Sequence, residues 1–151
     1  MRQQWMATMA KAPLDKLEQY WANLPPLPSY QMLRKPETGL AMVRGRDAVK
    51  GLPFNLGEMT ITRCVIQLVD DSLRSTEGTL VTGFGYVAGR SKRHAELAAL
   101  GDALLQCPDW FQTVYGKVID PLKDLAEAEK RARANEVEAT RVNFFTMQRG
   151  E

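Results

Sequence analysis

The stretch GRSKRHAELAALGDALLQC, from Gly89 to Cys107, holds the residues with the most evident chemical potential. Its pattern predicts a turn followed by a helix, with Arg90, Lys92 and Arg93 at the helix start and His94, the only histidine of the chain, beside them. A helix N-terminus carries partial positive charge and unpaired N–H groups, so each cation there costs about 0.3–1 kcal/mol. Either these side chains bend away into water, or a negatively charged group lies among them.

An anion site is the first chemistry that this pattern supports. The N–H groups of the helix start, flanked by Arg90 and Lys92, would bind a phosphate, a phosphonate or a carboxylate of a partner protein. The signal is weak as a motif, because GYVAGRSK matches neither a P-loop nor a dinucleotide-binding fingerprint. Cations that extend into solvent explain the same residues about as well, so both interpretations stay open.

Catalysis by His94 has less support. The triplet HAE, His94 to Glu96, is similar to the H-x-E element of zinc deaminases, but the chain lacks the P-C-x-x-C that completes such a metal site. A general base also needs an orienting partner and a nucleophile within reach, and Glu96 points to a different side of the helix. A histidine that forms structural hydrogen bonds is the default, and the residues assign no catalytic group, no metal and no cofactor.

Length and composition indicate one ordinary globular domain. A chain of 151 residues suits a single domain, 1–151, and the apolar share of 44% is normal. The net charge of +2 is too near neutral to indicate a nucleic-acid partner. Cys64 and Cys107 form no CxxC pair, and no apolar run suits a signal peptide or a membrane helix. We therefore expect a cytoplasmic protein with reduced thiols and no membrane partner.

The elements that must position these residues begin with helices and continue with strands. Helices are predicted over 3–10 and 14–23, and the prolines of LPPLPSY end the second one. Segment 30–47 should form a hairpin of two short strands around a tight turn at 37–39, where Gly39 is available for a positive φ. The best strand is FNLGEMTITRCVIQLVD, whose inward face should carry Thr60, Thr62, Cys64, Ile66 and Leu68.

The strand GTLVTGFGYVAG has an unusual alternation. Phe84 and Tyr86 share one face with Leu80, whereas Gly83 and Gly85 fall on the other, where another element can approach the backbone closely. The predicted strands follow one another without helices between them, which favours an antiparallel meander. The sequence thus predicts an α+β fold with a mostly antiparallel sheet of about four strands and helices at both ends of the chain.

The C-terminal third is predicted to be helical. Ser91 should cap a helix that ends near Gln106, and a second helix over 109–119 should bury Trp110, Phe111 and Val114. A charged helix follows over 121–140, with few large apolar residues, so it should lie partly in solvent or on a partner. The tail RVNFFTMQRG then regains apolar side chains, and we expect 121–151 to contact a partner.

Four motifs together resemble one protein family. PETGL at 36–40, GEMTITR at 57–63, GYVAGRSKRHAELAALGDALLQ at 85–106 and TRVNFFTMQRG at 140–150 resemble the PhnG subunit family of the bacterial carbon–phosphorus lyase system. Their order and spacing match over nearly the whole chain, whereas segment 47–56 fits less well. The resemblance is specific because the cationic helix start and the aromatic tail occur in combination.

The resemblance implies a role in phosphonate breakdown. Members of the family would assemble with a PhnI-like catalytic subunit and with PhnH- and PhnJ-like subunits, in a two-fold complex that holds two copies of the family member. With ATPase-like subunits, they support the transfer of the ribose triphosphate of ATP to an alkylphosphonate such as methylphosphonate, which releases adenine. The chain is then an enzyme subunit without a complete active site of its own.

Two sets of candidate residues follow from the motifs and the resemblance. A stand-alone phosphate- or nucleotide-binding protein, or a small enzyme, that uses Arg90, Lys92 and His94 stays open as the alternative function. The candidates for binding an anion or a partner are Arg90, Lys92, His94, Glu96 and Arg63, and those for a partner interface are Phe144, Phe145, Met147 and Arg149.

Overall fold

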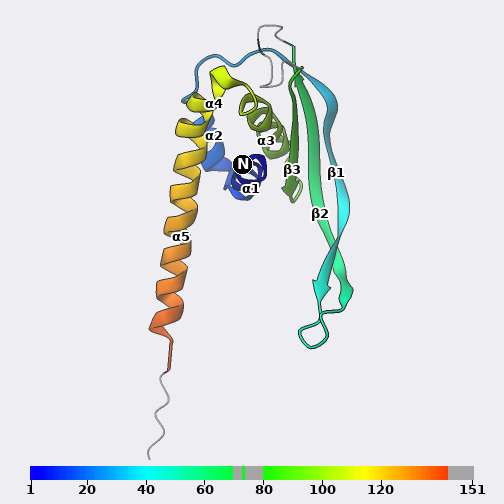
Figure 1. The fold of residues 1–151 in the computed structure, drawn as a ribbon, viewed down its shortest axis with the longest axis vertical. Coiled ribbons are helices and arrows are strands. Elements are labelled where there is room, and N and C mark those ends of the chain that lie inside the picture. Colours follow the sequence, from blue (N-terminus) through cyan, green and yellow to red (C-terminus); the bar gives the residue numbers. More distant parts are fainter. Residues whose placement is uncertain (70–72, 74–79, 143–151) are drawn as a thin grey trace, which may run out of the picture.

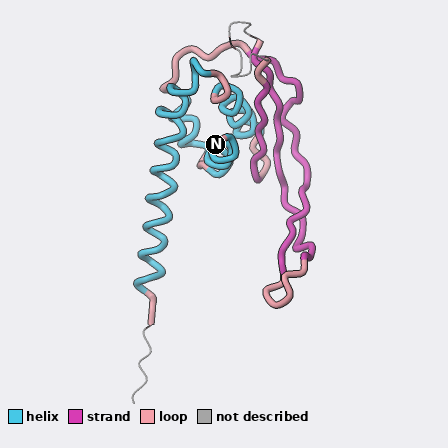
Figure 2. Tube along the Cα trace, viewed as in Figure 1, coloured by secondary structure: helices cyan, strands magenta, loops and turns pink. Residues whose placement is uncertain are grey.

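A computed structural model of the chain describes residues 1–69, 73 and 80–142. Helices and strands segregate into two layers, with the helices on one face of a sheet (Figures 1 and 2). The elements in chain order are α1 (Arg2–Lys11), α2 (Leu14–Trp21), β1 (Tyr30–Arg46), β2 (Pro53–Leu68), β3 (Thr82–Ala88), α3 (Lys92–Leu104), α4 (Pro108–Val114), the π-helical turn η1 (Tyr115–Ile119) and α5 (Asp120–Ala139).

The sheet is an antiparallel meander in the order β1-β2-β3. Its inward face carries Thr62, Cys64, Ile66 and Leu68 of β2, all of them buried, as the alternation predicted. The α+β class and the antiparallel topology are confirmed. The predicted number of about four strands is wrong, because the described residues form three.

The missing strand results from a turn that was predicted in the wrong place. β1 runs without interruption through the expected turn, where Glu37 pairs with Arg63 and Gly39 with Ile61. The Glu37 carboxylate accepts a hydrogen bond of 2.6 Å from Arg63 on β2, which holds this part of β1 extended. The residue in excess before Glu37 is taken up as an irregularity in the register between Arg34 and Glu37.

The real hairpin turn lies between β1 and β2, around Asp47 and Gly51. The Asp47 carboxylate accepts hydrogen bonds from the N–H groups of Val49 and Lys50, at 2.9 and 3.1 Å. Gly51 has φ +66°, the left-handed conformation that the prediction had assigned to Gly39. An Asx-type turn with a positive-φ glycine therefore closes one long hairpin.

The glycine face of β3 packs directly against α3, as predicted. A Cβ atom added at Gly83 or Gly85 would collide with the carbonyl oxygen of Ala99 or Ala95. The same atom at Gly85 would lie 2.8 Å from the backbone nitrogen of Ala99. Because glycine on the strand faces alanine on the helix, the two backbones approach each other more closely than larger side chains allow.

The buried carboxylate of Asp102 joins three elements at this contact. It accepts two hydrogen bonds from the guanidinium of Arg2, at 3.0 and 2.7 Å, and one of 3.1 Å from the indole N–H of Trp5. A fourth, of 3.0 Å, comes from the backbone N–H of Phe84 at the outer edge of β3. Four donors compensate the desolvated charge, so α1, α3 and β3 are held together at one point.

The helices agree with the sequence except at their boundaries and in the burial of two aromatic residues. α1 and α2 occupy the two predicted N-terminal segments, and α3 ends at Leu104, two residues before the expected end. Val114 is buried as expected, whereas Trp110 and Phe111 are only half-buried. Phe111 stacks on Tyr115 with ring centroids 5.2 Å apart, so these rings cover the core without entering it.

Two arms extend from the packed part of the molecule (Figure 1). One is the distal half of the β1–β2 hairpin, where Leu40, Met42 and Leu56 are 64%, 50% and 68% exposed. The other is α5, which is exposed from Ala126 to its end, in agreement with the prediction of a helix lying in solvent. Of the apolar tail, Val142 is exposed, and Phe144, Phe145, Met147 and Arg149 lie outside the described residues.

The glycine contact with α3 predicts a large effect of a single methyl group. Gly85→Ala should lower the free energy of unfolding by about 1–3 kcal/mol, because the helix backbone occupies the place of the new Cβ. Gly39→Ala on β1 is the matched control, since nothing lies within 4 Å of its added Cβ, and it should stay within about 0.5 kcal/mol. Urea unfolding of the isolated chain, followed by circular dichroism, measures both, and equal effects would contradict the close contact.

Candidate functional site

The start of α3 is a well-defined corner. Gly89, with φ +96°, turns the chain out of β3, and its N–H donates to the Thr60 carbonyl at 2.8 Å. The Thr62 hydroxyl donates to the Gly89 carbonyl at 2.7 Å. The Ser91 hydroxyl accepts a hydrogen bond of 3.2 Å from the His94 N–H, so Ser91 is the N-cap of α3, as predicted. The cationic cluster therefore sits on a backbone fixed at both ends.

One of the three cations at the helix start, Arg93, is paired with acidic side chains of the chain itself, among them the candidate Glu96. Arg93 donates to the Glu96 carboxylate at 3.2 Å and lies 3.7 Å from the carboxylate of Glu18 on α2. The other Glu96 oxygen accepts a hydrogen bond of 2.7 Å from the Tyr30 hydroxyl on β1. Glu18 and Glu96 thus supply part of the negative charge that we expected among the cations of the helix start.

The Tyr30–Glu96 contact has a measurable electrostatic consequence. The hydrogen bond to Glu96, followed by burial and the nearby negative charge, raises the pKa of Tyr30 to about 12. A neutral phenol is the donor that the Glu96 carboxylate needs, so loss of the proton would set two negative charges side by side. The contact ties the first residue of β1 to α3.

His94 forms a structural hydrogen bond, as the sequence led us to expect. The side chain is buried, and its Nε2 atom lies 2.8 Å from the carbonyl oxygen of Met9 near the end of α1. The ring nitrogen donates this bond, because a carbonyl accepts only. His94 therefore joins α1 to α3 through its Nε2 atom.

Arg90 and Lys92 remain as exposed cations, and in the described part of the chain neither forms a salt bridge. Arg63 lies elsewhere, on the face of the sheet turned away from α3. There the Glu37 carboxylate accepts from Arg63 at 2.6 Å and from Arg34 at 2.8 Å, and the hydrogen bond from Arg63 lowers the pKa of Glu37. The five predicted candidates thus do not converge on one site.

No thiol is available for nucleophilic chemistry. Cys64 and Cys107 are both buried, and burial raises the pKa of each thiol, that of Cys107 to about 11. At neutral pH both therefore stay protonated and unreactive. Within the described ranges, no three histidine, cysteine or acidic side chains lie close enough to hold a metal ion, and no helix is long and apolar enough to cross a membrane.

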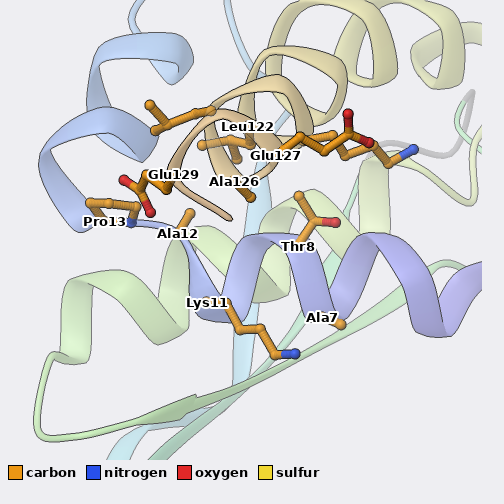
Figure 3. A pocket seen from close by; sticks show the side chains of 11 residues that line it. Ala7, Thr8, Lys11, Ala12, Pro13, Leu122, Ala126, Glu127 and Glu129 are labelled. Carbon is orange, nitrogen blue, oxygen red and sulfur yellow. The ribbon is translucent and has the colours of Figure 1, made fainter. Parts of the chain in front are cut away.

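A shallow groove of about 270 Å³ lies between α1 and α5, where α5 leaves the helical layer (Figure 3). Sequence reasoning missed it, although Leu122, Leu125 and Ala126 form an i, i+3, i+4 stripe on an otherwise polar helix. Its composition suits binding more than chemistry. The lining is small and apolar, with charges at the rim, and comprises Ala7, Thr8, Lys11, Ala12, Pro13, Leu122, Lys123, Leu125, Ala126, Glu127 and Glu129.

Comparison with known proteins gives two matches. The model of a family described as "Phosphonate metabolism protein PhnG" matches residues 1–150. A protein of Rhizobium meliloti (strain 1021), the alpha-D-ribose 1-methylphosphonate 5-triphosphate synthase subunit PhnG, is 39% identical over 150 residues, which cover 99% of this chain and 90% of that protein. Both likenesses extend over the packed domain and over the two arms.

The hydrogen bond between Tyr30 and Glu96 can be tested by titration. Phenolate absorbance against pH should show one tyrosine of the four that ionises near pH 12, and Glu96→Gln should return it toward about 10. Because the folded pKa is raised, the contact stabilises the fold below about pH 10, and this stabilisation is lost as the pH rises toward 12. Glu18→Gln is the control, and an equal effect from it would contradict the assignment.

Proposed function

Because the chain belongs to the PhnG family of phosphonate metabolism proteins, we propose that it is a subunit of an α-D-ribose 1-methylphosphonate 5-triphosphate synthase. The name of the Rhizobium meliloti relative supports this role, and the alignment covers nearly all of both chains. The complex would join the ribose triphosphate of ATP to an alkylphosphonate and release adenine.

The main support for a binding role is that the polar side chains best suited to catalysis form hydrogen bonds within the chain itself. His94 is bonded to Met9, Glu96 to Tyr30 and Arg93, and Asp102 to four donors. These hydrogen bonds use the groups to hold the fold together, which leaves them poorly placed to exchange protons with a substrate. We therefore assign the chemistry to a PhnI-like subunit, and binding and positioning to this chain.

The two arms support assembly with other subunits. They expose apolar side chains on the hairpin and at Val137 and Val142, an arrangement typical of surfaces that other proteins cover. The proposed partners are the PhnI-like subunit first, together with PhnH-, PhnJ- and ATPase-like subunits, in a two-fold complex with two copies of this chain.

Arg90 and Lys92 are proposed to face a carboxylate of a partner subunit. They are exposed and stand at a rigid corner, and the carboxylates of Glu18 and Glu96 at this helix start already pair with Arg93. A bound anion would convert the unfavourable clustering of cations at the helix start into binding energy. A stand-alone enzyme that uses Arg90, Lys92 and His94 is the alternative, and the buried position of His94 weighs against it.

Reconstitution separates the two functions. The partner subunits are mixed with ATP and methylphosphonate, with and without this chain, and adenine release is followed by chromatography. We expect release only when chain and partners are both present. Release by the isolated chain would support the alternative, and release by the partners in its absence would contradict the proposed role.

The cationic pair gives a prediction with an internal contrast. The double variant Arg90→Ala/Lys92→Ala should reduce assembly or adenine release while the melting temperature of the isolated chain stays nearly unchanged, since both side chains are exposed. His94→Ala should instead lower stability by about 1–3 kcal/mol, because the Met9 carbonyl loses its buried partner. If the double variant leaves assembly and activity intact, the pair is only a solvated surface.

The tail gives a second prediction for the same complex. A chain that ends at Arg141 lacks the apolar segment 142–147 and should no longer co-purify with the PhnI-like subunit, because the buried apolar area is lost. Its helical content and melting temperature should match those of the full chain, since Val142 is exposed and lies beyond the end of α5. Unchanged complex formation by the shortened chain would contradict the interface.

A further inference from the structure

We infer that the free edge of β1, between Glu37 and Val43, binds an extended strand of a partner subunit, and that this strand is apolar at its centre and acidic at both ends. β1 is an edge strand of the sheet, and its distal half extends past α1 and α3 (Figure 1). The inference deepens the proposed function, because it names the kind of contact by which one synthase subunit would hold another.

The hydrogen-bonding pattern shows which backbone groups face outward. On β2, the Thr60 carbonyl and the Leu68 N–H bond toward the β3 side, and so do the other even-numbered residues between them. By alternation, the odd-numbered residues of β2 bond to β1, where their partners in register include Glu37, Gly39, Ala41 and Val43. The N–H and C=O groups of Thr38, Leu40 and Met42 therefore point to the open edge.

This stretch lacks the features that usually protect an edge strand. The sequence TGLAMV, residues 38–43, contains no charge and no proline, and its register with β2 is regular. Irregularities flank it on both sides, between Arg34 and Glu37 and between Val43 and Arg44. A regular, uncharged segment between two irregular ones is a suitable template for strand addition.

The charges beside the stretch define the occupant. Arg34 and Lys35 precede it and Arg44 and Arg46 follow it. Arg34 is paired with Glu37 at 2.8 Å, whereas Lys35, Arg44 and Arg46 form no salt bridge within the described residues, so an unpaired cation borders the edge at each end. A second copy of this chain, paired antiparallel about Leu40, would bring Arg34 and Lys35 of one chain next to Arg44 and Arg46 of the other. Like charges facing each other are destabilising, so the pattern opposes self-pairing and favours a strand with carboxylates at its ends.

The side chains add apolar surface to the backbone contact. Leu40 and Met42 extend from the same face of β1 as Thr38 and are 64% and 50% exposed. The Thr38 hydroxyl lies 3.2 Å from that of Thr62 on β2, which anchors the near end of the stretch to the packed domain. An added strand would cover the two apolar side chains and pair the outward backbone groups at the same time.

A pair of variants at one position tests the backbone contact. Leu40→Pro removes the outward N–H, and proline is tolerated where that group is not needed by the sheet. Leu40→Val is the matched control, because the side chain of valine has as many carbon atoms as that of proline but valine keeps the backbone N–H. Each is co-expressed with the partner subunits, and we expect Leu40→Pro to reduce the co-purified partner by about tenfold and Leu40→Val by less than about twofold.

The outcomes separate this inference from the proposed function. If the unaltered chain does not co-purify with the partner subunits, both are wrong. If it does, and Leu40→Pro assembles equally well, or both variants fail alike while each folds, only the strand contact is wrong.

Hydrogen exchange on the unaltered chain gives an independent reading where the proline variant does not fold. The amides of Thr38, Leu40 and Met42 should exchange about tenfold more slowly in the complex than in the isolated chain, because a paired strand protects them. Equal exchange at these amides in the complex and in the isolated chain would overturn the inference.

Discussion

The close approach of α3 to the sheet is the constraint on which the rest of the structure depends. It exists because Gly83 and Gly85 present no side chain to the helix, whose backbone at Ala95 and Ala99 occupies that space. Only at this separation does the Asp102 carboxylate reach the N–H of Phe84 at the outer edge of β3, while α1 supplies Arg2 and Trp5 to the same group. A close contact between the two backbones therefore makes possible the buried polar network that holds the N-terminal helix.

This arrangement commits the chemically capable residues to the fold. His94 holds α1, Glu96 holds Tyr30 of β1, and Asp102 holds three elements, so each forms hydrogen bonds inside the domain. A chain built in this way can present to a substrate or to a partner only what lies on its surface. The surface offers exposed cations at one corner and apolar side chains along two arms, and the proposed role in binding and positioning rests on these groups.

Much of the fold was predictable because its signals are local. Strand alternation identified the inward face of β2 and the glycine face of β3, and the position of Ser91 identified the cap of α3. The turn at Gly39 failed because the residues that keep β1 extended, Glu37 and Arg63, are neighbours only across the strands. The site was less predictable for the same reason, since Arg2 meets Asp102 and Tyr30 meets Glu96 across 100 and 66 residues of sequence, and no local pattern reports such pairs.

Stability and assembly are carried by different residues in this chain. The core residues are contributed by the helices and by the inward face of the sheet. Leu40, Met42 and Leu56 are exposed and do not belong to this core. Apolar side chains on a hairpin that extends past α1 and α3 add little to the stability of an isolated chain. They also favour association with other chains through the uncharged edge of β1. The cations that border this edge reduce this tendency only against a second copy of the same chain, and they leave the edge open to a strand of opposite charge. The placement of charge around TGLAMV is therefore best understood as selection of a partner by the same residues that prevent self-association.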